Sequence, residues 1–170
     1  MDAKLIAEKT LKEFPYDFRA FTVDGFLSFV SEKRGRQIIA TPWTMPQKVF
    51  GAWLSDDEEP KEYIFYRDNV PAIHQIHIQL HELSHYLLGH PTLRINRQVI
   101  AEVLNTESSL PFDDLLKLRS PDHNPAEIEA ETLANLIQET VIRHYRLDQL
   151  IHDLSSEQKF ANFLTTMGLT

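Results

Sequence analysis

The stretch that decides the fold runs from residue 71 to residue 91 and reads PAIHQIHIQLHELSHYLLGHP. Its isoleucines and leucines recur every three or four residues, which places them on one face of an α-helix. A proline opens the stretch, and Gly89 with Pro91 closes it, as is typical of helix ends. We therefore predict a helix over residues 70–90, with an apolar back that packs on the rest of the domain.

This helix also carries a His-Glu-x-x-His pattern on a stripe separate from the apolar back. His81 and His85 are four residues apart, so their imidazoles stand on the same side and can hold one metal ion. Glu82 lies about 100° further round the helix, where it can take a proton from a water molecule instead of binding the ion. These are the parts of a metal-activated hydrolase. The bare pattern also arises by chance, and the separate stripe is what favours a metal site.

A catalytic zinc usually has three protein ligands, and this chain has no cysteine to provide one. A second helix, predicted over residues 124–145, offers three glutamates. Glu129 falls inside its apolar face, where a carboxylate needs a compensating charge, so we predict Glu129 as the third ligand. Glu127 is explained as part of a capping box with Asn124. The alternatives that stay open are Glu127, Glu131, Asp113 and Asp114.

Other histidines accompany this pattern. His74 and His77 share the stripe of the two ligands and are predicted to line its rim or support it, with a second metal position as the alternative. His90 is interpreted as a helix-end residue. His144 falls on the apolar face of the second helix and is interpreted as a core histidine, with assistance to catalysis left open.

The remaining sequence predicts a single α+β domain. Residues 1–35 indicate two amphipathic helices separated by Pro15. Residues 37–67 indicate a small antiparallel sheet of about three strands, Gln37–Trp43, Lys48–Leu54 and Glu62–Tyr66. The last two flank an acidic loop, which suggests a hairpin or a meander.

After the first histidine-bearing helix, residues 92–104 are compatible with a helix or in part with a strand. Residues 105–125 read as a surface loop. Residues 147–170 are predicted to form short C-terminal helices that follow the helix of residues 124–145.

Bulk properties limit the functional classes. A length of 170 residues suits one domain, and a net charge of −8 argues against nucleic acid or an anionic membrane as a direct partner. No stretch approaches the roughly 20 apolar residues needed to cross a bilayer, and the N-terminus does not resemble a signal peptide. The cytoplasm is therefore the expected compartment.

Several segments occur in the order seen in a known family: Val49–Leu54, Tyr63–Tyr66, Asn69–Pro71, His81–His90 and Glu127–Ala134. Together they cover about residues 37–140 and resemble the ImmA/IrrE family of metallopeptidases, which are gluzincin-like. The resemblance implies a zincin-like fold, with His81, His85 and Glu129 as metal ligands and Glu82 as the catalytic base.

The same resemblance implies a zinc-dependent endopeptidase that cleaves a partner protein, a DNA-binding helix-turn-helix repressor encoded nearby. Imidazole-rich sites favour zinc, and manganese or another divalent metal is kept as the alternative ion for this site. Two other functions are kept as alternatives. One is a non-catalytic, metalloprotease-like toxin, sensor or protein-binding module, and the other is a zinc hydrolase that acts on a small amide.

Overall fold

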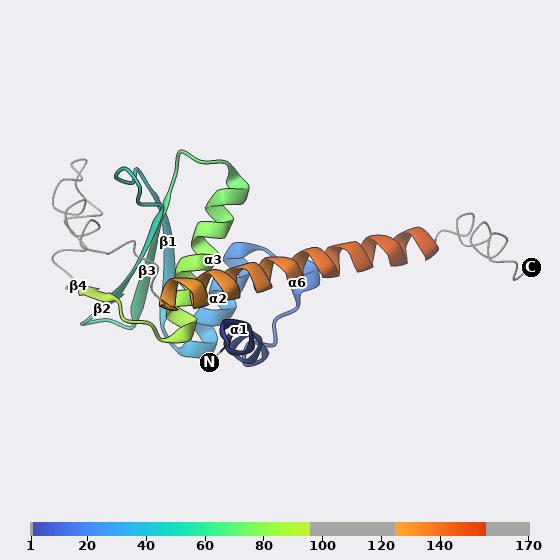
Figure 1. Ribbon diagram of the computed structural model, residues 1–170, viewed down its shortest axis with the longest axis horizontal. Helices are drawn as coiled ribbons and strands as arrows, with labels where there is room; N and C mark the ends of the chain where they lie inside the picture. Colours follow the sequence, from blue (N-terminus) through green and yellow to red (C-terminus); the bar gives the residue numbers. More distant parts are fainter. Residues whose placement is uncertain (1, 96–124, 156–170) are drawn as a thin grey trace, which may run out of the picture.

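The computed structural model describes residues 2–95 and 125–155 of the chain. In chain order the elements are α1 Ala3–Lys12, the 3-10 helix η1 Phe18–Ala20, α2 Val23–Arg34, β1 Gln37–Trp43, β2 Gly51–Asp56, β3 Lys61–Arg67, α3 Ala72–Leu88, β4 Leu93–Ile95 and α6 Pro125–Ser155. The predicted α+β class is confirmed. Figure 1 shows the helices gathered on one side of the sheet.

Local signals fix the two N-terminal helices. The side chain of Asp2 accepts a hydrogen bond from the Lys4 backbone at the start of α1, and Thr22 does the same for Gly25 at the start of α2. Helix α2 ends at Gly35, whose φ of 65° lies in the left-handed region. Both helices lie within the segment 1–35 that the sequence predicts to be helical.

The sheet differs from the prediction of about three antiparallel strands. Within residues 2–95 and 125–155 it has four strands in the order β1-β3-β2-β4. The hairpin is present, because β2 pairs antiparallel with β3, but β1 runs parallel to β3 and β4 runs parallel to β2. The prediction was wrong because it paired strands in chain order. The chain instead passes through residues 44–50 before β2, and β3 inserts between β1 and β2.

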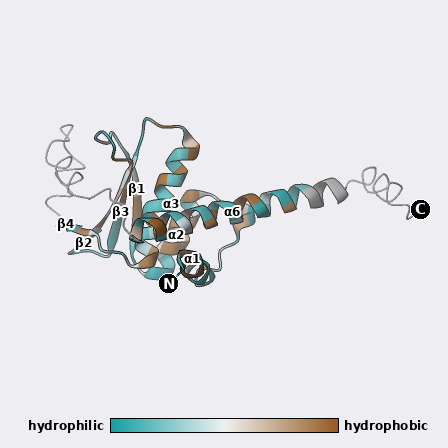
Figure 2. Cartoon of the chain, viewed as in Figure 1, coloured by the Kyte–Doolittle hydropathy of each residue, from teal (hydrophilic) through white to brown (hydrophobic). Residues whose placement is uncertain are grey.

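Both faces of the sheet are covered by apolar residues. Alternate residues of the hairpin face opposite sides: Ile64 joins the core beneath the helices, and Leu54 and Phe65 join a second cluster on the other face. The larger core contains the buried residues Ala7, Phe14, Phe18, Phe26, Leu27, Val30, Ile64, Leu80, Leu83, Leu87, Leu133, Ala134 and Ile137. Figure 2 shows hydrophobic residues on the first half of α6, where that helix crosses the others.

Helix α6 is longer than the predicted helix of residues 124–145. It continues without a break to Ser155 and projects beyond the body of the molecule (Figure 1). The predicted break at residue 146 has no glycine or proline to enforce it, and the helix therefore carries on. Residues 156–170, also predicted to be helical, lie outside the described residues. Within the described ranges no helix is long and apolar enough to span a membrane.

The packing of α6 gives a stability prediction. Leu133 is fully buried, whereas Ile128 on the same helix is 56% exposed. Leu133→Ala should lower the free energy of unfolding by about 2–5 kcal/mol because it leaves a cavity in the core. Ile128→Ala should change it by less than about 0.5 kcal/mol. Urea denaturation measures both, and equal effects of the two substitutions would contradict this packing.

Candidate metal centre

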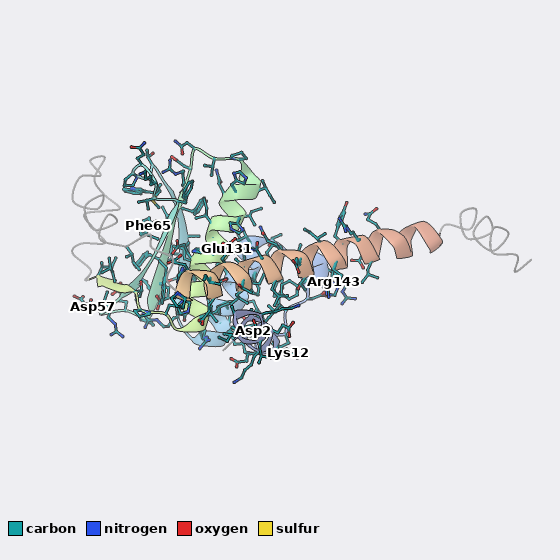
Figure 3. All side chains as sticks on the ribbon, viewed as in Figure 1. Asp2, Lys12, Asp57, Phe65, Glu131 and Arg143 are labelled. Atoms are coloured by element: carbon teal, nitrogen blue, oxygen red, sulfur yellow. The ribbon has the colours of Figure 1, made fainter. Side chains whose placement is uncertain are left out.

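Two polar stripes face each other where α3 and α6 cross. The stripe on α3 consists of His77, His81 and His85. The stripe on α6 consists of Glu127, Glu131 and Gln138. His77 contacts Gln138 at one end, and His85 contacts Glu127 at the other. Residues that come earlier in α3 contact residues that come later in α6, so the two helices run antiparallel. Figure 3 shows Glu131 at this crossing.

Three potential ligand atoms converge in this stripe. The Nε2 atoms of His81 and His85 are 3.1 Å apart, and they lie 3.2 and 3.4 Å from one carboxylate oxygen, Oε2 of Glu127. In the described ranges these three residues are the group whose ligand atoms could hold one metal ion. A tetrahedral zinc ion with bonds of about 2.0–2.1 Å would need neighbouring ligand atoms about 3.3–3.4 Å apart. The triangle has the size that such an ion requires.

The contact of the other ring nitrogen of His81 favours one tautomer of this imidazole. Nδ1 of His81 lies 3.2 Å from Oε2 of Glu131. Because an ionised carboxylate only accepts hydrogen bonds, Nδ1 donates, and the Nε2 atom of a neutral imidazole is left with a free lone pair. This lone pair points at the carboxylate of Glu127, which also only accepts. Lone pairs that converge in this way repel each other unless a cation lies between them.

Glu131 is well placed to hold that tautomer. Partial burial opposes ionisation of its carboxyl group. The charge of His77, a hydrogen bond from Asn135 and the interactions with His81 outweigh this effect and lower the pKa of Glu131 below its ordinary value. The carboxylate thus stays ionised as the acceptor for His81, in the arrangement that commonly orients metal-binding histidines.

Glu82 occupies a different position from the three ligand candidates. Its side chain is buried and lies against the first residue of β2, Gly51. A Cβ atom on Gly51 would fall 2.8 Å from Oε1 of Glu82 and 2.6 Å from Cγ2 of Ile78. Only glycine at this point leaves the carboxylate the space that it occupies between α3 and the sheet.

The structure groups Glu127, and not the predicted Glu129, with the two histidines. Oε2 of Glu129 lies 3.2 Å from Nε2 of His90, on the other side of the site. Glu129 is predicted as the ligand because a carboxylate on an apolar face needs a compensating charge. That prediction assigns Glu127 to helix capping and does not use the four-residue spacing of Glu127 and Glu131, which places both on the stripe that faces α3. The alternatives Asp113 and Asp114 lie outside the described residues.

The four other histidines that the sequence analysis considers lie in different surroundings. His77 supports the stripe through Glu131 and Gln138, whereas His74 is exposed. His144 stacks on Phe18, with ring centroids 6.4 Å apart, and belongs to the packing around η1. His90 was interpreted as a simple helix-end residue, but its Nδ1 atom lies 2.9 Å from Nδ1 of His85. The helical wheel placed it on the apolar side because the wheel was continued past Gly89, where the helix stops.

A cavity of ≈ 590 Å³ lies beside His90, between the end of α3 and the β2–β3 loop. In its wall the buried Glu62 accepts hydrogen bonds from Arg36 at 2.5 Å and from Trp53 at 2.6 Å. These contacts fix the hairpin to the segment before β1. Tyr86 also lines the cavity, and burial, followed by the charge of Glu62, raises the pKa of its hydroxyl group.

The convergence of the three ligand atoms predicts a specific pattern of metal loss. The purified protein should bind close to one equivalent of zinc, and His81→Ala should lose it because one of the three ligands is removed. His74→Ala is the matched control, since His74 lies on the same helix but is exposed. Metal analysis by mass spectrometry gives both values. Zinc retained in the His81 variant would contradict the site.

No protein-family model, curated protein or solved structure matches this chain. Its function therefore has to follow from the residues of the site and from the motifs of the sequence.

Proposed function

We propose that this protein is a zinc-dependent endopeptidase with a zincin-like fold, which hydrolyses a peptide bond in a partner protein. The observation that carries the proposal is the triangle of ligand atoms from His81, His85 and Glu127, two of which come from the helix that also bears the buried Glu82. A site with two imidazoles, one carboxylate and a neighbouring general base is typical of metal-dependent amide hydrolysis.

The metal ligands and Glu82 have different roles in the proposed hydrolysis. Zinc in this site would make a water molecule acidic and polarise the carbonyl of the scissile bond. Glu82 takes the proton of the attacking water and delivers it to the leaving amine. Its burial against Gly51 holds the carboxylate at one place and keeps bulk water from competing for it. Glu127 and the two histidines keep their lone pairs directed at the metal position.

Strand β2 is the element on which an extended substrate would bind. Strand β3 has a neighbour on each side, so its edges are occupied. In the described part of the chain, β4 pairs with β2 only at Leu54–Asp56. The Trp53 carbonyl accepts a hydrogen bond from the Thr92 hydroxyl, so the edge proposed for a peptide, added as another strand, is the start of β2 at Gly51 and Ala52, beside Glu82. Main-chain hydrogen bonds of this kind supply affinity with little demand on sequence.

The substrate class rests on the resemblance of the motifs to the ImmA/IrrE family. It favours a DNA-binding helix-turn-helix repressor, encoded nearby, as the protein that is cleaved in the cytoplasm. A net charge of −8 disfavours direct contact with nucleic acid and fits recognition of the regulator itself. Zinc is the proposed metal, because two of the three ligands are imidazoles.

The role of Glu82 is tested by Glu82→Gln, which keeps the shape of the side chain but cannot accept a proton. This variant should keep its zinc and its fold and lose about 10²–10⁴-fold in cleavage rate. The assay incubates the zinc-loaded protein with intact regulators encoded beside its gene and follows the fragments by mass spectrometry. Glu139→Gln, an exposed site on α6, is the control. Near-wild-type cleavage by Glu82→Gln would rule out this role, and an inactive wild type would favour the non-catalytic alternative.

The contact between Glu82 and β2 gives a second test. Gly51→Ala should displace the Glu82 side chain, because the added Cβ would overlap both Glu82 and Ile78. Cleavage should fall by at least tenfold while the bound zinc stays near one equivalent, since the atoms nearest to the added Cβ belong to Ile78 and Glu82 and not to the three ligands. Parallel measurement of zinc content and rate separates the two effects. Loss of zinc together with activity would show that Gly51 supports the metal site instead.

A further inference from the structure

His90 contacts His85 of the candidate metal site because α3 ends in a left-handed turn at Gly89. Gly89 has a φ of 70°, and the backbone NH of His90 donates to the carbonyl of His85 at 3.0 Å. The turn directs the His90 ring back over the last turn of the helix, where its Nδ1 atom lies 2.9 Å from Nδ1 of His85. On the far side of the ring, Nε2 lies 3.2 Å from Oε2 of Glu129 on α6.

The protons in the chain of contacts from Glu129 through His90 to His85 can be assigned from either end. An ionised carboxylate on Glu129 only accepts, so Nε2 of His90 carries a proton and donates it. The Nδ1 atom of a neutral His90 then has a lone pair and accepts from Nδ1 of His85. His85 is left with a free lone pair on Nε2, the atom that belongs to the ligand triangle. The same tautomers follow from the other end: a metal bound to Nε2 of His85 would leave the proton of that ring on Nδ1, which then donates to Nδ1 of His90.

We propose that Glu129 and His90 form an outer pair that orients His85 and strengthens it as a metal ligand, an inference that rests on the proposed metal site. His90 accepts a hydrogen bond from Nδ1 of His85, just as Glu131 accepts one from Nδ1 of His81. Both metal-binding imidazoles thereby have the Nδ1–H group held by a partner and the Nε2 lone pair directed at the ion. His90 and Glu129 are positioning residues, since neither contacts the metal position itself.

This arrangement excludes Glu129 from direct ligation. The ring of His90 stands between the Glu129 carboxylate and His85, because the two neighbours contact opposite nitrogens of that ring. The contact with His85 is also made to Nδ1, whereas the ligand triangle uses Nε2. Glu129 therefore acts on the site only through His90, and Glu127 fills the third ligand position.

Zinc affinity, measured by competition with a chromophoric chelator, separates the roles of the two glutamates. Glu129→Ala should keep one zinc per protein but bind it about 10–100-fold more weakly, as expected for the loss of an outer partner. Glu129→Gln keeps an acceptor for His90 and should recover part of that loss. Glu127→Ala removes a ligand and should weaken binding more than Glu129→Ala. Glu139→Ala, on the exposed side of α6, is the control and should bind zinc as the wild type does.

Nitrogen-15 NMR of the histidine rings tests the pair without metal or activity. In the wild type, Nδ1 of His85 and Nε2 of His90 should be the protonated nitrogens, and Glu129→Ala should change the tautomer signals of both rings. The proposal is overturned if the Glu129 variants leave both zinc affinity and these signals unchanged. It is also overturned if Glu129→Ala abolishes zinc binding and Glu127→Ala does not, because Glu129 would then be the ligand. A wild type that binds no zinc would refute the metal site, whereas the tautomers of the metal-free protein would still test the pair.

Discussion

The site depends on one constraint: two imidazole nitrogens and one carboxylate oxygen are held within 3.1–3.4 Å of each other. With both imidazoles neutral and protonated on Nδ1, all three atoms are acceptors, which repel one another and have lost part of their hydration. A divalent cation bound between them would remove the repulsion and replace the lost hydration. The antiparallel crossing of α3 and α6 enforces this geometry.

The apolar core provides the rigidity that the crossing needs. Leu80 and Leu83 of α3 and Leu133 of α6 are fully buried in one cluster. Ala130 and Ala134, one helical turn apart, are also fully buried, and their small side chains let α6 approach its neighbours closely. Polar residues then line the margin of this interface. The outer partners Glu131 and His90 hold the two imidazoles, so the core fixes the backbones and the hydrogen bonds fix the rings.

Much of the architecture could be predicted because it follows from local signals. The apolar periodicity predicts the helix with His81 and His85, and the glycine and proline residues predict its ends. The acidic loop between two apolar strands predicts the hairpin. The parallel pairing of β1 with β3 could not be read in the same way, since it depends on a contact between segments that are not neighbours in the sequence.

The candidate third ligand shows the limit of a helical wheel. A wheel identifies the face on which Glu129 lies, but it does not say which face of α6 meets the histidines of α3. In the structure Glu127 and Glu131 contact the histidine stripe of α3, whereas Glu129 contacts His90. His90 was missed for a related reason, since a wheel assumes that the helix continues. The glycine that ends α3 was visible in the sequence, and it is the signal that could have placed His90 beside His85.

The most direct measurement is a crystal structure of the zinc-loaded protein with anomalous diffraction recorded at the zinc absorption edge. The account predicts one strong anomalous peak about 2.0–2.2 Å from Nε2 of His81, Nε2 of His85 and a carboxylate oxygen of Glu127. Glu129 should remain on His90, outside the ligand shell. A peak bonded to Glu129 in place of Glu127, or no peak between α3 and α6, would contradict it.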